Sequence, residues 1–189
     1  MKNEIATPKE KIFQTAAHLF YQHGYRAIGV DTIAAESGVG KMTLYRHYPS
    51  KDDLIVAYLR EWNDIFWNNF EQLTKDVPTP RGKLLAVFQF MQEYIKTPAC
   101  YGCPFLNVAT EYPELDYPGH QVALEHKQSV RARFCQLARE TGAANPEALA
   151  DQLALLLDGA YMASRMFGAQ SPTAHLAEAA QILIDASIK

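Results

Sequence analysis

The stretch GVGKMTLYRHYPSKDDL, residues 38–54, contains a Gly-Lys pair followed closely by a threonine. Such a pair suggests either a loop that cradles nucleotide phosphates or a segment that contacts DNA. A phosphate-binding loop requires a glycine, four residues and then Gly-Lys-Ser/Thr, because the last hydroxyl ligates magnesium. Here Met42 follows Gly40-Lys41, and Ala35 stands where the first glycine belongs. The preceding DTIAAESG is alanine-rich and predicts a short helix instead of a buried strand, so the nucleotide interpretation fails.

Two short helices joined by a tight turn are predicted around this stretch. The first covers residues 31–37 and stops at Gly38, which can adopt a left-handed backbone conformation without a Cβ penalty. The second covers residues 41–48 and is stopped by Pro49. This pattern is typical of a helix-turn-helix, which places its second helix in the major groove of DNA. The small or apolar positions that would fix the helix crossing are Ala34, Val39 and Leu44.

The exposed face of the second helix is predicted to carry hydrogen-bond donors and an aromatic side chain. Donors near the N-terminal end of a short helix suit contacts to base edges and phosphates. Lys51 and the free amides at the start of the next helix lie beside it, where they could bind phosphate. A solvated helix pair without a partner would carry similar residues, and only the ordered set favours DNA. The candidates on this helix are Lys41, Thr43, Tyr45, Arg46 and His47.

The composition predicts a protein with an adequate hydrophobic core. The chain has 189 residues, 48% of them apolar, which suits one sizeable domain or two smaller ones. A formal charge of −3 excludes a uniformly basic coat for nucleic acid. Residues 1–50 carry six basic and four acidic side chains, whereas the rest of the chain carries 12 and 17. This asymmetry fits two functional halves, although random surface charge fits it nearly as well.

The chain has three cysteines, and it shows neither a signal peptide nor an apolar run of bilayer length. These features predict a cytoplasmic protein without a membrane partner. Helical periodicity runs through the chain, and no strand pattern is apparent. We therefore expect an all-α fold: an N-terminal three-helix helix-turn-helix domain (1–50), then a larger helical domain (51–189). The first helix begins at Pro8, with Thr7 as its N-cap, and Ser50 caps a long fourth helix. Later helices are expected at 81–96, 105–112, 119–141, 146–167 and 172–188.

Residues 12–54, IFQTAAHLFYQHGYRAIGVDTIAAESGVGKMTLYRHYPSKDDL, resemble the DNA-binding domain of the TetR family of bacterial transcriptional regulators. The match is nearly continuous and is specific in HGY, IAAESGV and TLYRHYPSK. The later GCPFLNVATEYPELDYPGHQVALEHK, residues 102–127, resembles one subset of that family less diagnostically. The resemblance implies an all-α homodimer that binds a palindromic operator in double-stranded DNA, usually as a repressor. A small-molecule effector in the C-terminal domain would change the spacing of the two DNA-reading helices.

One position departs from the family pattern. The family often has a Thr or Ser just before the second helix, where its hydroxyl binds phosphate. This chain has Ile28-Gly29 there, and Thr32 is the candidate that takes over this contact.

The resemblance also assigns the last two long helices to dimerisation through a four-helix bundle. Gly159 and Ala163 are small enough for close helix approach, which supports the assignment independently. One buried side on each helix would suffice equally well for packing inside the monomer. The apolar positions expected at the dimer contact are Leu149, Leu153, Leu156, Leu157, Ala160, Leu176, Ala179, Ala180, Leu183 and Ile184.

An effector pocket is expected in the larger domain, although aromatic residues at helical spacing are more often plain core. Four polar residues, Asn107, His126, Asp158 and Arg165, fall within otherwise apolar helices. They could converge as polar anchors or equally lie at the surface or in satisfied core positions. Without a charge excess, neither an acidic nor a basic effector is favoured. The lining candidates are Trp62, Phe66, Met91, Tyr94, Phe105, Asn107, Tyr161 and Arg165.

Cys100 and Cys103 form a CxxC pair that has three interpretations. Zinc requires four ligands at paired spacing, and neither a second CxxC nor an HxxxH occurs, so no metal or other cofactor is predicted. A redox switch would use Cys103 at the N-terminus of a helix that begins at Pro104, where the pKa of a thiol is lowered. The third interpretation is a turn with two reduced, partly buried thiols. We expect that oxidation is not the main signal.

Enzymatic function is not predicted, because the six histidines are scattered and no HExxH or nucleophile elbow occurs. The alternative to a regulator is a small-molecule-binding or enzymatic helical module with a vestigial DNA reader.

Overall fold

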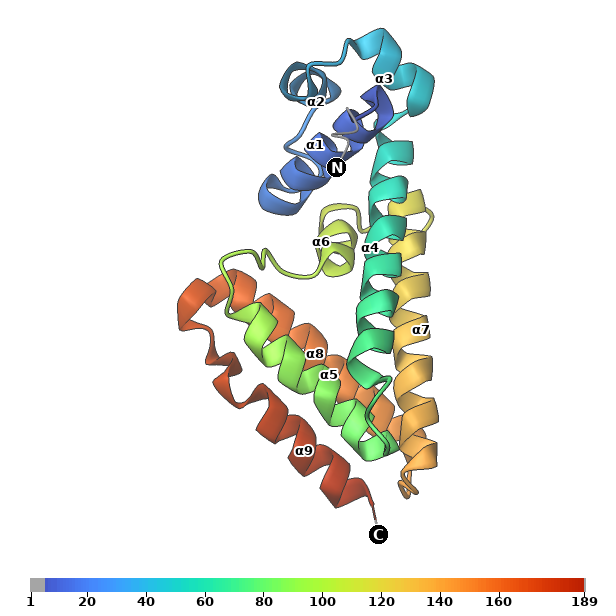
Figure 1. The fold of residues 1–189 in the computed structure, drawn as a ribbon, viewed down its shortest axis with the longest axis vertical. Coiled ribbons are helices and arrows are strands. Elements are labelled where there is room, and N and C mark those ends of the chain that lie inside the picture. The colour runs from blue at the N-terminus through green and yellow to red at the C-terminus, as the bar shows by residue number, and fades with distance from the viewer. Residues whose placement is uncertain (1–5, 189) are drawn as a thin grey trace.

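The computed structural model describes residues 6–188, which form α-helices and contain no strand. Three short helices form one end of an elongated molecule, and α4 leads from that end into a second group of helices (Figure 1). The all-α prediction, with a helix-turn-helix domain ahead of a larger helical domain, is confirmed. The helices are α1 (Pro8–His23), α2 (Val30–Ser37), α3 (Lys41–His47), α4 (Lys51–Thr74), α5 (Pro80–Ile95), α6 (Pro104–Glu111), α7 (Pro118–Glu140), α8 (Pro146–Phe167) and α9 (Leu176–Ser187).

Sequence signals at the helix ends act as predicted. Thr7 and Glu10 form a capping box at the start of α1, so two backbone amides that lack helical partners are satisfied. The Ser50 side chain accepts a hydrogen bond from the amide of Asp53 in the first turn of α4. Gly38 ends α2 with a φ of 67°, the left-handed conformation expected of it.

The last predicted helix begins later than expected. Residues 172–188 were expected to be one helix, but Pro172–His175 form a 3-10 turn and the α-helix starts at Leu176. Another 3-10 turn, Gly168–Gln170, follows α8. These two tight turns reverse the chain, so that α9 runs back along α8 and α5 (Figure 1).

The hydrophobic cluster of the N-terminal domain extends past residue 50, where the sequence placed the domain boundary. Phe20 and Leu44 of the three-helix domain share this cluster with Tyr58 of α4, Phe105 of α6 and Val122 of α7. The first half of α4 therefore packs with both domains. A shift of α4 or α6 would displace side chains that pack directly against the helix-turn-helix.

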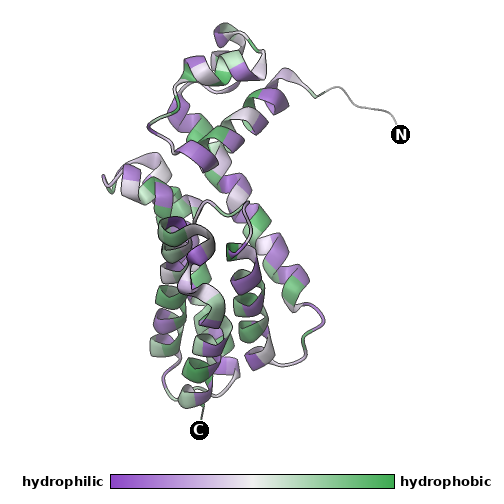
Figure 2. Cartoon of the chain, turned by 90° about the vertical axis from the view of Figure 1, so that its left-hand side faces the viewer, coloured by the Kyte–Doolittle hydropathy of each residue, from purple (hydrophilic) through white to green (hydrophobic). Residues whose placement is uncertain are grey.

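A second hydrophobic cluster joins α5, α7, α8 and α9, and hydrophobic residues line the helices of this part (Figure 2). It corrects the predicted dimer contact. Seven of the ten residues assigned to that contact are buried inside the monomer, because α7 and α9 cover this side of α8, and α5 and α8 cover the inner side of α9. They are Leu149, Leu153, Leu157, Ala160, Leu176, Ala180 and Ile184. Within residues 6–188, no helix is both long and apolar enough to cross a bilayer.

A different face of α8 is apolar and open to solvent. Leu155 is 73% exposed, and Met162 and Met166 are exposed as well. Together with Gly159 they follow the spacing i, i+4, i+7, i+11, which places all four on one side of the helix. A Cβ at Gly159 would meet nothing within 4 Å, so this stripe is bare in the monomer. Ile182 of α9 adds a neighbouring exposed apolar side chain.

Candidate functional site

Helices α2 and α3 adopt helix-turn-helix geometry. The amide of Val39 donates to the carbonyl of Ala34 over 3.2 Å, which closes the turn after Gly38. Leu44 is fully buried against the three-helix core, so α3 is held by its inner face. Its opposite face is therefore directed to solvent.

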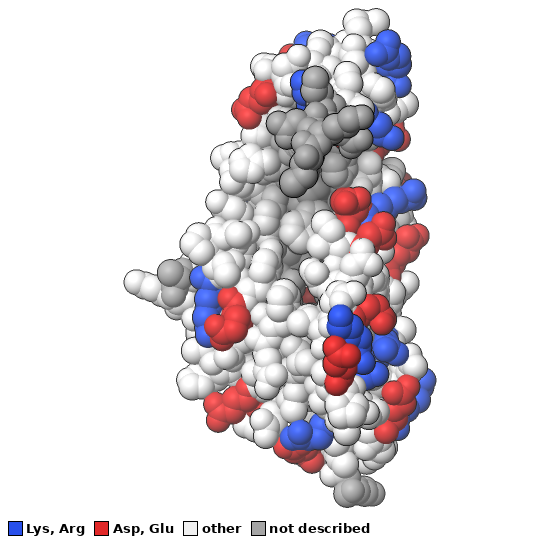
Figure 3. Space-filling view, viewed as in Figure 1, with Lys and Arg blue, Asp and Glu red and all other residues white. Residues whose placement is uncertain are grey.

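The outer face of α3 carries most of the DNA-contact candidates. Lys41, Tyr45 and Arg46 are exposed, whereas Thr43 and His47 are half-buried. Basic side chains are visible at this end of the molecule (Figure 3). Lys41 is paired with Asp31 of α2, an ion pair on the surface that a phosphate could replace. Thr32 is also exposed, on α2.

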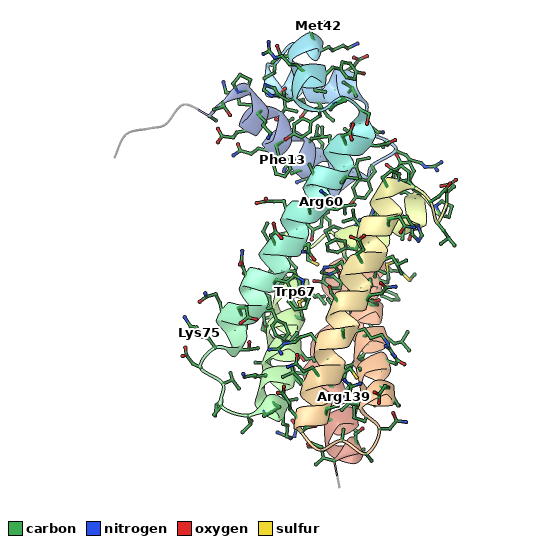
Figure 4. All side chains as sticks on the ribbon, turned by 90° about the vertical axis from the view of Figure 1, so that its right-hand side faces the viewer. Phe13, Met42, Arg60, Trp67, Lys75 and Arg139 are labelled. Atoms are coloured by element: carbon green, nitrogen blue, oxygen red, sulfur yellow. The ribbon has the colours of Figure 1, made fainter. Side chains whose placement is uncertain are left out.

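Met42 is a residue of this surface that the sequence analysis missed. It is 85% exposed and lies at the very tip of the molecule (Figure 4). Its side chain is apolar, whereas the predicted contacts rest on hydrogen-bond donors and an aromatic side chain. Its position between Lys41 and Thr43, at the exposed start of α3, was the available signal. Apolar side chains read thymine methyl groups in the major groove.

Lys51 has a structural contact that the sequence did not suggest. Its Nζ donates to the carbonyls of Tyr25 and Ile28, over 2.9 and 3.1 Å. These carbonyls lie in the connection between α1 and α2. The ammonium therefore ties the start of α4 to that connection and retains one N–H for another acceptor.

Glu111, at the end of α6, holds the same connection from the other side. Its Oε1 accepts from the amide of Tyr25 over 3.0 Å, and its Oε2 accepts from the amide of Arg26 over 2.7 Å. A Cβ at Gly24, where φ is 88°, would lie 2.7 Å from Oε1. Only glycine leaves room for this carboxylate. The sequence analysis did not single out Glu111, because its partners are backbone groups 85 or more residues away.

A cavity of about 210 Å³ lies between α4, α5, α7, α8 and the start of α6. Six of the eight predicted lining residues line it: Trp62, Phe66, Met91, Tyr94, Phe105 and Tyr161. Tyr21 of α1 also contributes to the wall, so the DNA-binding domain forms part of the cavity.

Asn107 and Arg165 do not line this cavity, contrary to prediction. Both side chains donate to the carbonyl of Tyr101, from Nδ2 over 3.2 Å and from Nη1 over 2.6 Å. They fix the loop before α6. Asn107 is buried, but its amide is occupied by this loop carbonyl, and Arg165 lies on the outer, exposed side of α8.

Tyr21 and Tyr94 connect the cavity wall to the DNA-binding domain. Their hydroxyl oxygens are 3.1 Å apart, and Tyr21 also donates to the carbonyl of Gly102 over 3.1 Å. The ring of Tyr21 packs against that of Trp62, with 5.1 Å between centroids. Burial raises the pKa of both tyrosines, so both hydroxyls are neutral.

His126 lines the cavity as a neutral ring. It stacks on Phe105 with 3.7 Å between ring centroids, and Phe66 meets it edge-on. Burial, helped by the charge of Lys127, lowers the pKa of His126 to about 3. Its Nδ1 lies 2.9 Å from Oδ1 of Asn63. The sequence analysis had left His126 open as either an anchor or a satisfied polar group.

Lys127 lines the cavity and forms an ion pair with Asp158, which lies outside the cavity wall. Burial lowers the pKa of Lys127, but the adjacent Cys103 thiol and Asp158 carboxylate outweigh it and raise the pKa overall. Lys127 therefore stays charged and is compensated by Asp158. The pair leaves no net charge at this wall.

The cysteines are free, and Cys103 is the N-cap residue of α6. The redox-switch interpretation requires a lowered thiol pKa, but burial raises the pKa of Cys103 and outweighs the opposite effects of Lys127 and the helix amides. Cys100 is half-buried, with its Sγ 3.6 Å from the hydroxyl of Ser164. In residues 6–188, no three His, Cys, Asp or Glu side chains converge as metal ligands would.

Comparison with known proteins gives matches along nearly the whole chain. Residues 12–58 match the family described as "Bacterial regulatory proteins, tetR family", and residues 80–180 match "Tetracyclin repressor-like, C-terminal domain". The "Uncharacterized HTH-type transcriptional regulator YxaF" of Bacillus subtilis (strain 168) is 27% identical over 180 residues, which cover 93% of this chain and 94% of that protein.

Two solved structures from Streptomyces are similar over their full length. SCO4454, a TetR-family transcriptional regulator from Streptomyces coelicolor, is 29% identical, with a TM-score of 0.92 and 96% of each chain covered. The putative TetR transcriptional regulator sav143 from Streptomyces avermitilis is 32% identical, with a TM-score of 0.87 and 96% and 98% of the two chains covered.

A helix-turn-helix with donors on its outer face, joined to a helical domain with a cavity, defines a DNA-binding transcriptional regulator. The chain belongs to the TetR family of bacterial transcriptional regulators, which are not enzymes.

Proposed function

We propose that the protein is a cytoplasmic repressor that binds a palindromic operator as a homodimer and is released by a small-molecule effector. The observation that carries this proposal is the shared wall of the cavity. Tyr21 belongs to the DNA-binding domain, and residues 102–105 lead into and begin α6, yet all of them line the same cavity. A ligand in this cavity would therefore press on Tyr21 of α1 and on the start of α6.

The route from the cavity to DNA runs along α6. The first turn of α6 lines the cavity, while Glu111 in its last turn holds the amides of Tyr25 and Arg26. Since α6 is eight residues long, a shift at one end moves the other. The α1–α2 connection would follow, and with it the orientation of α3. The two reading helices of a dimer would then no longer match the half-site spacing.

On the DNA, we assign base contacts to Thr43 and Tyr45, and add an apolar contact from Met42 to a thymine methyl group. Phosphate or mixed contacts are assigned to Lys41, Arg46, His47 and Thr32. Lys51 would add at most one donor to phosphate, because two of its N–H groups are bound to backbone carbonyls.

The homodimer is supported by the bare apolar stripe on α8. Leu155, Gly159, Met162 and Met166 form a continuous apolar strip that would be covered by the same strip of a second copy. A two-fold dimer would also match a palindromic operator.

Selection on a randomised DNA library tests the central proposal. The purified protein should enrich inverted repeats whose half-sites lie one or more helical turns apart. Footprinting should then protect both half-sites. Failure to enrich any sequence would support the alternative, a small-molecule-binding or enzymatic helical module with a vestigial DNA reader.

A further inference from the structure

The protonation of His126 is determined by its neighbours. The Asn63 amide nitrogen donates to a carboxylate oxygen of Asp64, over 3.4 Å, so the amide oxygen of Asn63 faces His126. A carboxamide oxygen only accepts, and the Nδ1 of His126 must therefore carry the hydrogen. In a neutral imidazole the other nitrogen, Nε2, is then a bare acceptor.

Nε2 has no hydrogen-bond partner among residues 6–188, and the ring that carries it lines the cavity. Asn63, which binds Nδ1, is not part of the cavity wall. The ring is clamped between Phe105 and Phe66, so it is fixed in orientation. A ligand group that meets Nε2 must donate a hydrogen, because an acceptor there would face an acceptor.

The remaining cavity wall carries no uncompensated charge. Lys127 is neutralised by Asp158, and burial keeps the tyrosine hydroxyls and the Cys103 thiol protonated. An anionic or cationic ligand would lose its hydration without gaining a free counter-charge. The cavity therefore disfavours ions of either sign.

The size and walls of the cavity define the rest of the ligand. An apolar cavity of about 150 Å³ holds a benzene ring, so about 210 Å³ has room for one substituted ring or two fused rings. Trp62, Phe66, Phe105 and Tyr161 offer aromatic faces and edges to a planar molecule.

Building on the proposed effector role of this cavity, we propose that its ligand is an uncharged one- or two-ring aromatic compound that carries a hydroxyl donor, and that His126 Nε2 accepts this hydrogen. His126 is thus the specificity-determining residue of the cavity. Phenols and naphthols are the simplest members of this class.

Calorimetric titration at pH 7, without DNA, tests the ligand class. The probes are β-naphthol, its methyl ether, naphthalene and β-naphthoate. The ether and naphthalene bracket naphthol in size but lack the donor, and naphthoate is an anion. Naphthol should bind about threefold to tenfold more tightly than the two donor-free compounds, the range of one neutral hydrogen bond. Naphthoate should bind more weakly than naphthol.

Variants assign the preference to one residue. In His126→Phe, which keeps the stacked ring but loses the acceptor, the preference for naphthol over its ether should vanish. Tyr161→Phe is the matched control, since it removes a hydroxyl from the same cavity and should leave the preference intact. Thermal melting verifies that both variants are folded, and the comparison of probes on the unchanged protein needs no variant.

The proposal is overturned if the ether or naphthalene binds as tightly as naphthol, if naphthoate binds best, if no probe binds, or if the preference survives in His126→Phe. Release of the operator by naphthol is measured separately. Preferential binding without release would leave the ligand class standing and contradict only the effector role.

Discussion

The Glu111 side chain accepts a hydrogen bond from the backbone amide of Tyr25, with 3.0 Å between Oε1 and N, across 86 residues of sequence. Its second oxygen accepts from the next amide, that of Arg26. A carboxylate that binds two successive amides fixes the position of the backbone that carries them. This contact joins the end of α6 to the connection that orients the helix-turn-helix.

Glu111→Ala should therefore loosen the DNA-binding domain. Loss of two hydrogen bonds to amides that water can partly reach should lower the free energy of unfolding by about 1–2 kcal/mol. Operator affinity should fall, and release by an effector should become weaker, because α6 no longer holds the connection. Binding isotherms with and without effector measure the operator affinity and its loss on effector binding. Glu114→Ala is the control: its contact with Arg26 spans 4.0 Å between exposed side chains and should matter little.

Lys51→Ala separates a structural role from a phosphate contact. Because Nζ is bound to the carbonyls of Tyr25 and Ile28, the main loss should be in the stability of the three-helix domain. Operator affinity should decrease for all DNA sequences alike. If Lys51 also binds a phosphate through its third N–H, the slope of log affinity against log salt should become less steep by about one. An unchanged slope would restrict Lys51 to the structural role.

Leu155→Glu should convert the proposed homodimer into a monomer, since it places a charge at the N-terminal end of the apolar stripe on α8. Light scattering at micromolar concentration should show half the mass, and operator affinity should fall with it. Leu115→Glu offers a control of equal chemistry: Leu115 is 70% exposed, close to the 73% of Leu155, but lies in the loop before α7. If the Leu155→Glu protein were still a dimer, the apolar stripe on α8 would not be the interface.

His126 should make the protein less stable in mild acid. Its pKa is lowered to about 3 in the fold, so between there and about 6.5 the unfolded chain binds a proton that the folded chain does not. The free energy of unfolding from this group thus decreases as pH falls below about 6.5, by about 1.4 kcal/mol per pH unit. The stability difference between His126→Phe and the unchanged protein, measured by urea unfolding from pH 7 to pH 5, should shift in favour of the variant. A constant difference would contradict the neutral ring.

Local sequence signals were sufficient for most of the helix ends and for the solvent-exposed outer face of α3. Gly38, Ser50 and Thr7 act on neighbours a few residues away, so their effects follow from sequence alone. A helix face that is buried inside the monomer and a helix face that forms an interface are both apolar stripes in the sequence. Which of the two a face of α8 is depends on where α7 and α9 pack, and the sequence does not show this. Asn107 and Arg165 were misplaced for the same reason: the carbonyl they share, that of Tyr101, is a tertiary partner.

The final prediction concerns the reading helix. Loss of a base contact in Thr43→Ala should cost on the order of 1–3 kcal/mol on the cognate operator and relax the preference at one base pair. Met42→Ala should relax the preference for thymine at a neighbouring position, because Met42 lies at the exposed start of α3 and is the most exposed large apolar side chain within residues 6–188. Tyr45→Phe distinguishes base from phosphate: a change of preferred sequence assigns the hydroxyl to a base, and uniform weakening assigns it to phosphate.

Arg46→Ala completes this set as the phosphate control. Its loss should weaken binding to all sequences alike and reduce the salt dependence by about one unit of slope. Selection on randomised DNA with each variant provides the measurement. If Arg46→Ala changed the preferred sequence while Thr43→Ala did not, the assignment of base and phosphate contacts along α3 would have to be reversed, and the C-terminal half of the helix would lie deepest in the groove.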